Sequence, residues 1–358
     1  MSWHWPFPFA PKLDWLQVEI SSQCNAACLY CPRTIYQDRW LNQRMEVDLF
    51  RRLLPILKKT DLVYLQGWGE PFTHPDFFQF VQIAKTADCR VGTTTNGMLL
   101  DAGHCEQLVA EGVDIVCFSL AGTGEDNDQI RQGTRLAKVL SVIETIDHIK
   151  QRTCSDQPAV HIAYLLLRSG LGDIHRLVDL LKGRGLAQVV ISTLDLVCST
   201  SLAQETIGPG TGLDDQAIRR QLEAVVSAGK DTGLPIHFRL PASRKVQQPS
   251  EDLPEAETLL VLAKPQLCTE NIQHSAFIGA TGTVSPCVFT NLPVSGVRHV
   301  VAQGDRPYQP MVFGDIQEQS FATIWRSTDY SSFRKTHRSG TPPLICQHCT
   351  KTLLSDHR

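Results

Sequence analysis

The apolar residues between positions 13 and 239 fall into two repeating patterns. Short runs rich in β-branched and aromatic residues alternate with longer stretches in which apolar residues recur at helical spacing. The runs predict strands at 16–20, 62–66, 90–95, 115–120, 160–166 and 188–194, and the stretches predict helices at 48–58, 75–85, 101–111, 136–152, 173–184 and 214–233. Such strand–helix units, joined by right-handed crossovers, indicate an α/β fold in which helices cover a parallel sheet.

The chain outside residues 13–239 has a different character. Residues 1–12 are aromatic and rich in proline, which predicts an N-terminal arm packed on the domain, and residues 240–264 predict a linker because they start with a polar, proline-rich stretch. Residues 265–358 contain a hairpin pattern at 277–284, a short helix at 321–326 and few other regular signals. A small loop-rich module of this kind usually needs a metal as its core.

Composition narrows the class of protein. The chain has 358 residues, of which 42% are hydrophobic, and no apolar run reaches the roughly 18 residues of a membrane span. The N-terminus lacks the basic start and continuous apolar core of a signal peptide. The net charge of −3 gives no electrostatic reason to expect nucleic acid. Seven of the 12 cysteines cluster at metal-ligand spacings, which fits a reducing cytoplasm better than a disulfide framework. We therefore expect a cytoplasmic protein, and the charge and hydropathy predict no nucleic acid or membrane partner.

The first cysteine cluster follows the first predicted strand. Cys24, Cys28 and Cys31 have C-x3-C-x2-C spacing, which can hold three irons of a [4Fe–4S] cube and leave the fourth iron open to a substrate. The alternatives are a zinc site or unrelated thiols. Zinc usually takes a second ligand pair nearby, and no His or Cys follows Cys31 until His74. The spacing therefore favours an iron–sulfur cluster built for chemistry.

This loop resembles the signature of the radical S-adenosylmethionine (SAM) superfamily, including the aromatic Tyr30 before the third cysteine. The resemblance implies that the open iron chelates the methionine end of SAM. One electron, from a low-potential donor of flavodoxin or ferredoxin type, then cleaves a C–S bond and releases a 5′-deoxyadenosyl radical that abstracts hydrogen from a substrate. The superfamily uses a partial (β/α)6 TIM barrel, which agrees with the strand–helix units of residues 13–239.

Polar motifs at the next strand ends resemble the family's SAM-binding segments, and in α/β barrels functional groups lie at these ends. Gly69, Glu70 and Pro71 match a G-G-E-P motif that holds the SAM amino group, although Trp68 stands where glycine is usual. Without its context, this segment would be an ordinary strand-to-helix turn. The resemblance makes it a cofactor-binding loop.

Three further strand or helix segments supply candidate SAM contacts. Thr94 and Asn96 share one face of the third strand by period-two alternation, so both can point into the barrel toward a ribose or carboxylate. Ser119 ends the fourth strand and resembles a serine that contacts the SAM ribose or carboxylate. Arg131 resembles the arginine of an I-R-G signature on the following helix, which pairs with the SAM carboxylate. The plainer alternatives are a Thr-rich strand closed by an Asn-Gly turn and a surface arginine.

A second cysteine set lies in the C-terminal region and consists of Cys268, Cys287, Cys346 and Cys349. It resembles the auxiliary-cluster modules named SPASM and, in shortened form, twitch. Part of the full SPASM cysteine pattern, C-x5-C-x3-C, is absent. Four cysteines would ligate a second, auxiliary [4Fe–4S] cluster fully, which indicates an electron-relay or structural role. A zinc knuckle held by the same thiolates is the alternative that the spacing permits. The other five cysteines are expected to fill the apolar interior.

These features together predict a radical SAM enzyme whose auxiliary cluster aids oxidation or electron transfer in small-molecule or cofactor biosynthesis or maturation. The alternative within the family is a peptide- or protein-modifying maturase, so the expected substrate is a small molecule or a peptide. No winged helix for peptide recognition precedes Cys24, which makes the peptide alternative the weaker one. A different class of protein, a non-catalytic iron–sulfur carrier or scaffold, would have no need of a SAM-binding pocket. The sequence assigns no catalytic side chain.

Overall fold

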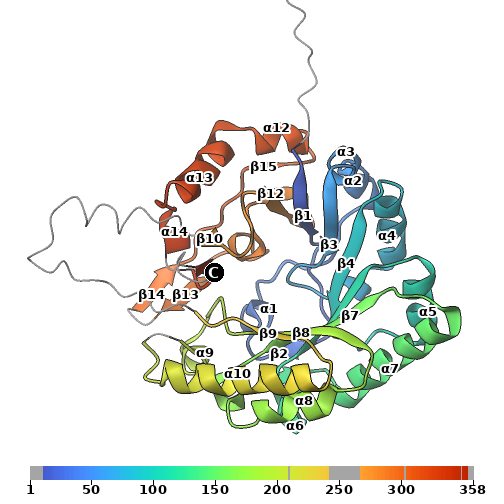
Figure 1. Cartoon of the computed structure of the whole chain (residues 1–358). Coiled ribbons are helices and arrows are strands. Elements are labelled where there is room, and N and C mark those ends of the chain that lie inside the picture. The colour runs from blue at the N-terminus through green and yellow to red at the C-terminus, as the bar shows by residue number, and fades with distance from the viewer. Residues whose placement is uncertain (1–10, 209, 242–266, 302–303, 348, 354–358) are drawn as a thin grey trace, which may run out of the picture.

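The computed structural model describes residues 11–208, 210–241, 267–301, 304–347 and 349–353. Most of the predicted N-terminal arm (1–12) and of the predicted linker (240–264) lies outside these residues. A curved parallel sheet forms the centre of the molecule, and helices cover its outer face (Figure 1). The predicted α/β fold class, a partial barrel followed by a small loop-rich C-terminal region, is confirmed.

The predicted strands all occur, shifted by at most three residues. They are β1 (Leu13–Val18), β3 (Thr60–Leu65), β4 (Arg90–Thr95), β5 (Ile115–Leu120), β7 (Ala159–Leu165) and β8 (Leu186–Ser192). Neighbours pair in parallel in that order, and the short β9 (Ile236–Phe238) extends the sheet beyond β8. In the middle strands the side chains on both faces of the sheet are buried. The sequences of these strands are therefore nearly continuous apolar runs.

The outer helices are α4 (Phe77–Lys85), α5 (Ala102–Ala110), α7 (Leu136–Thr153), α8 (Leu177–Leu181) and α10 (Asp215–Asp231) (Figure 1). Two predicted helices are broken. The segment 48–58 forms α2 (Val47–Arg51) and α3 (Leu54–Leu57), because Pro55 has no N–H to continue the first helix. The segment 173–184 forms the 3-10 turn η3 (Ile174–Arg176) followed by the short α8.

The C-terminal region continues the same sheet. Strand β11 (Ser275–Ile278) pairs in parallel with β1, and β12 (Thr283–Ser285) returns antiparallel to β11, which confirms the predicted hairpin. Strand β15 (Gly314–Asp315) pairs with β12 and ends the order β15-β12-β11-β1-β3-β4-β5-β7-β8-β9. The C-terminal strands therefore cover the β1 edge, which would otherwise present unpaired backbone groups.

The remaining C-terminal elements surround these strands. They are η4 (Val288–Thr290), the pair β13 (Arg298–Val301) and β14 (Gly304–Pro307), α12 (Phe321–Trp325), α13 (Thr328–Arg338), α14 (Leu344–Gln347), and the pair β10 (Leu267–Cys268) and β16 (Thr352–Leu353). In Figure 1 they extend from the β1 edge round to α9 (Thr200–Ala203), on the side of the barrel away from α5. Helix α12 matches the predicted short helix, whereas α13 was not predicted.

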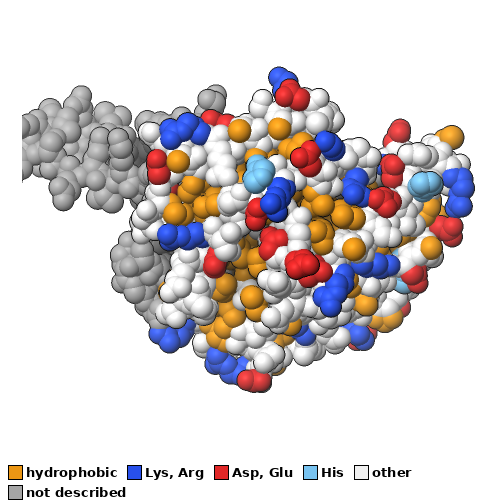
Figure 2. Space-filling view, turned by 90° about the horizontal axis from the view of Figure 1, so that it is seen from below, with side chains coloured by type: hydrophobic (Ala, Val, Ile, Leu, Met, Phe, Trp, Pro, Cys, Tyr) orange, Lys and Arg blue, Asp and Glu red, His pale blue; other side chains and the backbone are white. Residues whose placement is uncertain are grey.

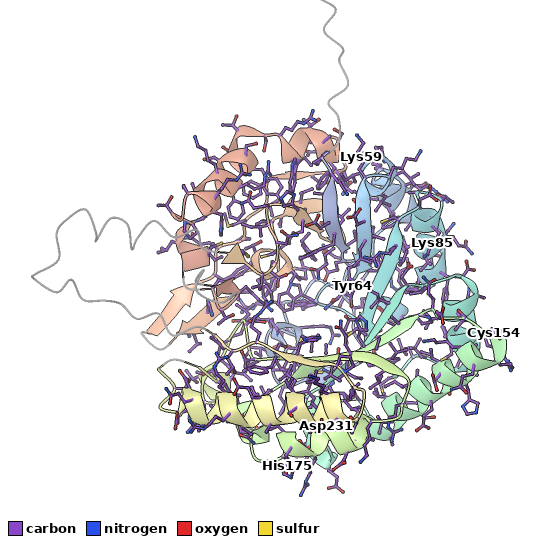
Figure 3. All side chains as sticks on the ribbon, in the orientation of Figure 1. Lys59, Tyr64, Lys85, Cys154, His175 and Asp231 are labelled. Atoms are coloured by element: carbon purple, nitrogen blue, oxygen red, sulfur yellow. The ribbon has the colours of Figure 1, made fainter. Side chains whose placement is uncertain are left out.

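The interior of the barrel is closed by large side chains. Tyr64 on β3 points inward, and its hydroxyl lies 3.1 Å from the Thr94 hydroxyl (Figure 3). Cys89, Cys105, Cys117 and Cys198 are buried as expected, but Cys154 at the end of α7 is exposed (Figure 3). The expectation that this cysteine fills the interior was therefore wrong.

The surface mixes both signs of charge. On the face seen in Figure 2, Lys and Arg side chains alternate with Asp and Glu, and apolar side chains show between them. Within the described ranges, no helix is both long and apolar enough to cross a membrane.

Candidate functional site

The first cysteine loop is fixed by pairing with a distant segment. Strand β2 (Ala27–Cys28) pairs antiparallel with β6 (Arg131–Gln132), and this register places Cys28 opposite Arg131. Cys31 directly precedes the short helix α1 (Pro32–Ile35), and its carbonyl accepts the Thr34 N–H at 3.0 Å. The loop is thus held at both ends by backbone hydrogen bonds while the cysteine side chains remain partly exposed.

The three thiols of this loop lie close together. The pKa of the Cys31 thiol is raised to about 12, mainly by burial and in part by the neighbouring Cys28 and Cys24 thiols. Burial, together with Glu70 and Cys28, also raises the pKa of Cys24. A positively charged metal centre would remove this penalty, because coordination deprotonates a thiol outright. The donor set therefore fits a thiolate-ligated iron–sulfur cluster.

No group of three or more His, Cys, Asp or Glu side chains in the described part of the chain is arranged to hold a single metal ion. The thiolates of a [4Fe–4S] cube bind separate irons at its corners, so they need not converge on one point.

A pocket of about 270 Å³ opens at the carboxyl ends of the barrel strands, beside the cysteine loop. Its lining includes all three cysteines of the loop and the predicted SAM contacts Tyr30, Gly69, Glu70, Thr94, Asn96, Ser119 and Arg131. The remaining predicted residue, Pro71, does not line the pocket; it is buried at the start of the 3-10 turn η1 (Pro71–Thr73). Residues predicted from five separate segments therefore meet around one cavity.

Glu70 ties three loops of this pocket together. Its backbone N–H donates to the Gln23 carbonyl of the cysteine loop at 2.7 Å. Its buried carboxylate accepts hydrogen bonds from the Thr95 hydroxyl and the Asn96 N–H, each at 2.7 Å. Burial raises the pKa of the Glu70 carboxyl, and these donors oppose the rise. The carboxylate is thereby fixed in the pocket wall.

The glycines beside Glu70 are required by close packing. A Cβ on Gly69 would lie 2.3 Å from the Ser21 carbonyl oxygen, and a Cβ on Gly67 would lie 2.3 Å from the Glu19 carboxylate. Between them, the Trp68 N–H donates to Glu19 Oε1 at 2.6 Å. The turn is therefore pressed against β1, and only glycine fits at its two close approaches.

Arg131 lies in the pocket wall next to the cysteine loop. It was expected on the helix after the fourth strand, but α6 (Glu125–Ile130) ends one residue earlier and Arg131 begins β6. Its guanidinium is buried and donates a hydrogen bond to the Tyr30 hydroxyl. Tyr30, Cys28, Cys24 and Glu70 all favour the charged form of Arg131, and together they raise its pKa despite the cost of burial. A buried cation therefore lines the pocket beside the cysteine loop.

The second cysteine set also comes together. Cys268 ends β10, Cys287 precedes η4, Cys346 lies on α14 and Cys349 follows that helix. Burial raises the pKa of the Cys287 thiol well above its usual range, and Glu270 and the other three thiols contribute to this rise. Burial also raises the pKa of Cys268 and Cys346 to about 12 and that of Cys349 to about 11. A cationic metal centre would remove the cost of ionising these four buried thiols, so this cysteine set also fits such a centre.

Several residues of the site were not identified from the sequence, and Glu19, Asp195 and Phe289 are among them. Glu19 directly follows β1 and accepts a hydrogen bond from the Gly67–Gly69 turn, and Asp195 and Phe289 line the pocket. A glutamate at the end of an apolar strand and an aspartate just after another were the available signals. Phe289 carried no signal, because its contact with the pocket depends on how the C-terminal strands join the sheet.

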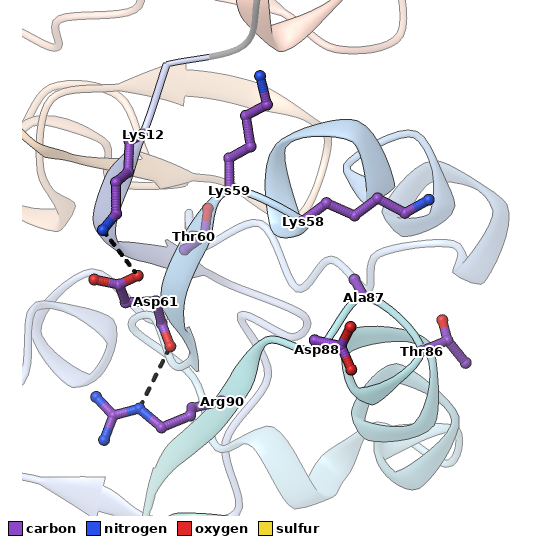
Figure 4. Close-up of a pocket in the computed structure, with 9 residues that line it drawn as sticks. All are labelled: Lys12, Lys58, Lys59, Thr60, Asp61, Thr86, Ala87, Asp88 and Arg90. Atoms are coloured by element: carbon purple, nitrogen blue, oxygen red, sulfur yellow. Dashed lines mark hydrogen bonds and ion pairs between the residues drawn. The ribbon is translucent and has the colours of Figure 1, made fainter.

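A larger hollow, of about 1050 Å³, lies at the opposite end of the sheet (Figure 4). It is lined by residues at the amino ends of β1, β3 and β4, including Lys12 and Asp61, which form an ion pair at 3.7 Å. Its lining contains no cysteine and no residue predicted to bind a cofactor.

Comparison with protein-family models gives two matches. Residues 18–181 match the radical SAM superfamily, and residues 268–350 match SPASM, an iron–sulfur cluster-binding domain. The two matches contain, respectively, the first and the second cysteine set.

Two relatives match along most of their length. The tungsten-containing aldehyde ferredoxin oxidoreductase cofactor-modifying protein of Pyrococcus furiosus is 24% identical over 344 residues, which cover 94% of this chain and 87% of that protein. The AdoMet-dependent heme synthase of Methanosarcina barkeri is 23% identical over 335 residues, which cover 91% and 84%. Among solved structures, Streptococcus suis SuiB bound to S-adenosylmethionine has a TM-score of 0.65 at 16% identity, covering 94% of this chain and 71% of SuiB. That last similarity concerns the fold.

Proposed function

The chain belongs to the radical SAM superfamily and carries a SPASM iron–sulfur domain, and from this premise we propose that it modifies a small molecule or cofactor by SAM-derived radical chemistry. In this proposal Cys24, Cys28 and Cys31 hold the cluster that cleaves SAM. Cys268, Cys287, Cys346 and Cys349 hold a second, auxiliary [4Fe–4S] cluster.

The observation that carries the proposal is the composition of the 270 Å³ pocket. Three cysteines, a buried carboxylate, a buried guanidinium and several hydroxyl and amide groups surround it. A protein that only carried electrons would need the cysteines alone. The additional polar groups support a pocket for a charged, zwitterionic ligand such as SAM.

When bound, the first cluster supplies the electron that cleaves SAM to the 5′-deoxyadenosyl radical. The residues of the chain bind and orient the ligand. The Gly69 backbone and the Glu70 carboxylate would bind its ammonium group, and Arg131 would pair with its carboxylate. Thr94, Asn96 and Ser119 would contact ribose or carboxylate oxygens.

The auxiliary site is suited to a role in electron transfer. With four cysteines, every iron of a [4Fe–4S] cluster has a protein ligand, so no iron is left to bind substrate. Phe289, two residues after Cys287, lines the SAM pocket. An auxiliary cluster held by these cysteines would therefore lie near the pocket, where it would supply an electron acceptor.

The substrate class is inferred from the relatives. The two that match over more than 90% of this chain are named for modifying a cofactor and for making heme. This supports a small-molecule or cofactor substrate ahead of a peptide. A flavodoxin- or ferredoxin-type protein is the proposed electron donor.

The proposal is tested by anaerobic reconstitution with iron and sulfide, followed by incubation with dithionite and SAM. Chromatography should detect 5′-deoxyadenosine, formed slowly in the absence of substrate. If protein loaded with both clusters releases no 5′-deoxyadenosine, the iron–sulfur carrier is the better description.

A further inference from the structure

Two segments that carry auxiliary cysteines each bind one wall of the SAM pocket. The first contact is made by Trp68, in the loop after β3. Its indole N–H donates to the carbonyls of Val288 and Asn291, each at 3.1 Å. Its ring also meets Phe289 edge to face, with centroids 5.9 Å apart. These three partners form the turn that directly follows Cys287.

The second contact is made by Asp195, in the loop after β8. Its Oδ1 accepts the Thr350 hydroxyl at 2.7 Å, and its Oδ2 lies 2.7 Å from Lys351 Nζ. Both partners directly follow Cys349. The Asp195 and Lys351 side chains are only 17% and 15% exposed, so this ion pair is shielded from the solvent that weakens surface pairs.

Lys351 links the two contacts. Its ammonium lies 5.3 Å from the centre of the Phe289 ring and 3.6 Å from Glu270, which is two residues after Cys268. Trp68, Asp195 and Phe289 all line the pocket. The same side chains that shape the pocket are therefore bonded to the segments that carry the auxiliary cysteines.

Those segments have little regular structure of their own. Cys287 precedes a three-residue 3-10 turn, and Cys268 lies on a two-residue strand. Loops of this kind are ordered by the metal that their cysteines bind, since metal binding and folding are coupled. In the G-G-E-P motif that this loop resembles, glycine usually stands at the position of Trp68. A glycine there would make neither the ring contact with Phe289 nor the indole hydrogen bonds.

We propose that Trp68 and Asp195 are positioning residues through which the assembled auxiliary site shapes the SAM pocket. Each residue fixes one pocket loop: Trp68 fixes residues 67–70 and Asp195 fixes residues 193–199. The pocket reaches its working form when Cys268, Cys287, Cys346 and Cys349 hold their metal centre. This inference rests on the proposed function, because the cavity is taken as the SAM site.

The test uses the full-length protein with both clusters and two substitutions, each of which removes a hydrogen-bond donor. Trp68→Phe keeps an aromatic ring but loses the N–H, and Thr350→Val loses only the hydroxyl. Thr350 does not line the pocket, so its replacement cannot disturb SAM directly. Trp15→Phe on β1 and Thr336→Val on α13 are the matched controls; the Thr336 hydroxyl bonds only within its own helix, to the Phe333 carbonyl at 2.8 Å.

Hydrogen exchange and SAM binding are the readouts. We expect Trp68→Phe to speed amide exchange about tenfold in residues 67–70. Thr350→Val should have the same effect in residues 193–199. Both variants should bind as much iron as the parent protein. SAM affinity should fall about threefold to tenfold in both variants and remain at the parent value in both controls. Cys346→Ala combined with Cys349→Ala should speed exchange in both loops.

Parent-like exchange and SAM affinity in Trp68→Phe and Thr350→Val would overturn the inference. So would unchanged exchange in both pocket loops after loss of the auxiliary metal. Either result leaves the proposed function intact as long as the parent protein binds SAM and forms 5′-deoxyadenosine. A parent protein that binds no SAM would instead remove the proposed function.

Discussion

The guanidinium of Arg131 is buried at the site, and several neighbouring groups stabilise its charge instead of a single carboxylate. Its guanidinium contacts the Tyr30 hydroxyl and lies near Cys24, Cys28 and Glu70, all of which stabilise its charge. A cation of this kind in a low-dielectric pocket attracts an anionic ligand more strongly than a surface arginine would. Arg131 is therefore the residue on which SAM carboxylate recognition depends most in this account.

Replacing Arg131 with methionine should weaken SAM binding about ten- to a hundredfold, because one charge-assisted hydrogen bond contributes ~1.5–3 kcal/mol. Equilibrium binding of SAM to the reconstituted protein measures the effect, with iron determined in the same samples. Arg135→Met, four residues away and exposed, is the control and should bind SAM like the parent. Equal affinities in the two variants would remove Arg131 from the site.

Glu19 is a second buried charge with a measurable consequence. Burial raises the pKa of its carboxyl from 4.5 to about 7, although the backbone N–H groups of Trp68, Ala280 and Gly69 oppose the rise. Because the folded-state pKa is the higher one, the stability contributed by Glu19 is complete below about pH 4.5. That contribution is lost as the pH rises through about 7.

We therefore expect the parent to lose roughly 1–1.5 kcal/mol of unfolding free energy through Glu19 between pH 6 and pH 8. Glu19→Gln should lack this loss, because the amide stays neutral. Urea unfolding of both proteins at the two pH values measures the difference. The exposed Glu223→Gln on α10 should keep the parent's pH dependence. Parallel pH profiles for the parent and Glu19→Gln would contradict the assignment.

At the scale of elements, the pairing of β2 with β6 decides the shape of the cysteine loop. Gly133 follows β6 with a φ of +85°, and a Cβ there would lie 3.1 Å from Ala26 Cα. The loop that carries Cys24 and Cys28 is therefore packed directly against this glycine. A side chain at this position would push the two segments apart.

Gly133→Ala should lower the iron bound at the first site after reconstitution by a half or more, and SAM cleavage should fall in proportion. The control is Gly183→Ala, which has a similar φ of +74° and no atom within 4 Å of the added Cβ. Both substitutions carry the same backbone cost, about 1 kcal/mol. A parent-like iron content in Gly133→Ala would show that the pairing does not position the cysteines.

The helices and strands that could be predicted are those whose apolar pattern is visible within a short stretch of sequence. Strands β4 and β5 were placed to the residue, because both their faces are buried and the turns at their ends are clear. Helix α13 was missed because its buried side is narrow and consists of Tyr330, Phe333 and His337. The parallel pairing of β11 with β1 could not be predicted, since it joins segments about 260 residues apart.

The same limit applies to the site. Residues that belong to a recognisable motif could be named from the sequence, and the structure brings most of them to one pocket. Asp195 and Phe289 could not, because they reach the pocket only through the folded positions of the β8 loop and the C-terminal region.

At the scale of the whole molecule, the barrel and the C-terminal region form one continuous sheet, with two cysteine sets that the chain brings near a single pocket. Strand β11 covers the open edge of β1, and the turn after Cys287 closes the pocket through Phe289. In the proposed function this architecture separates two tasks: the first cysteine set, which lines the pocket, would serve the ligand, and the second would hold an auxiliary cluster. The central proposal is that each cysteine set binds its own cluster and that only the first cluster cleaves SAM.

The most direct test replaces Cys24, Cys28 and Cys31 together with alanine and measures 5′-deoxyadenosine and iron in the reconstituted protein. The account predicts no 5′-deoxyadenosine and about four irons per chain, all at the auxiliary site. Cys154→Ala, at the exposed cysteine, should keep both clusters and full SAM cleavage. A triple variant that still cleaves SAM, or one that retains zinc in place of iron, would contradict the account.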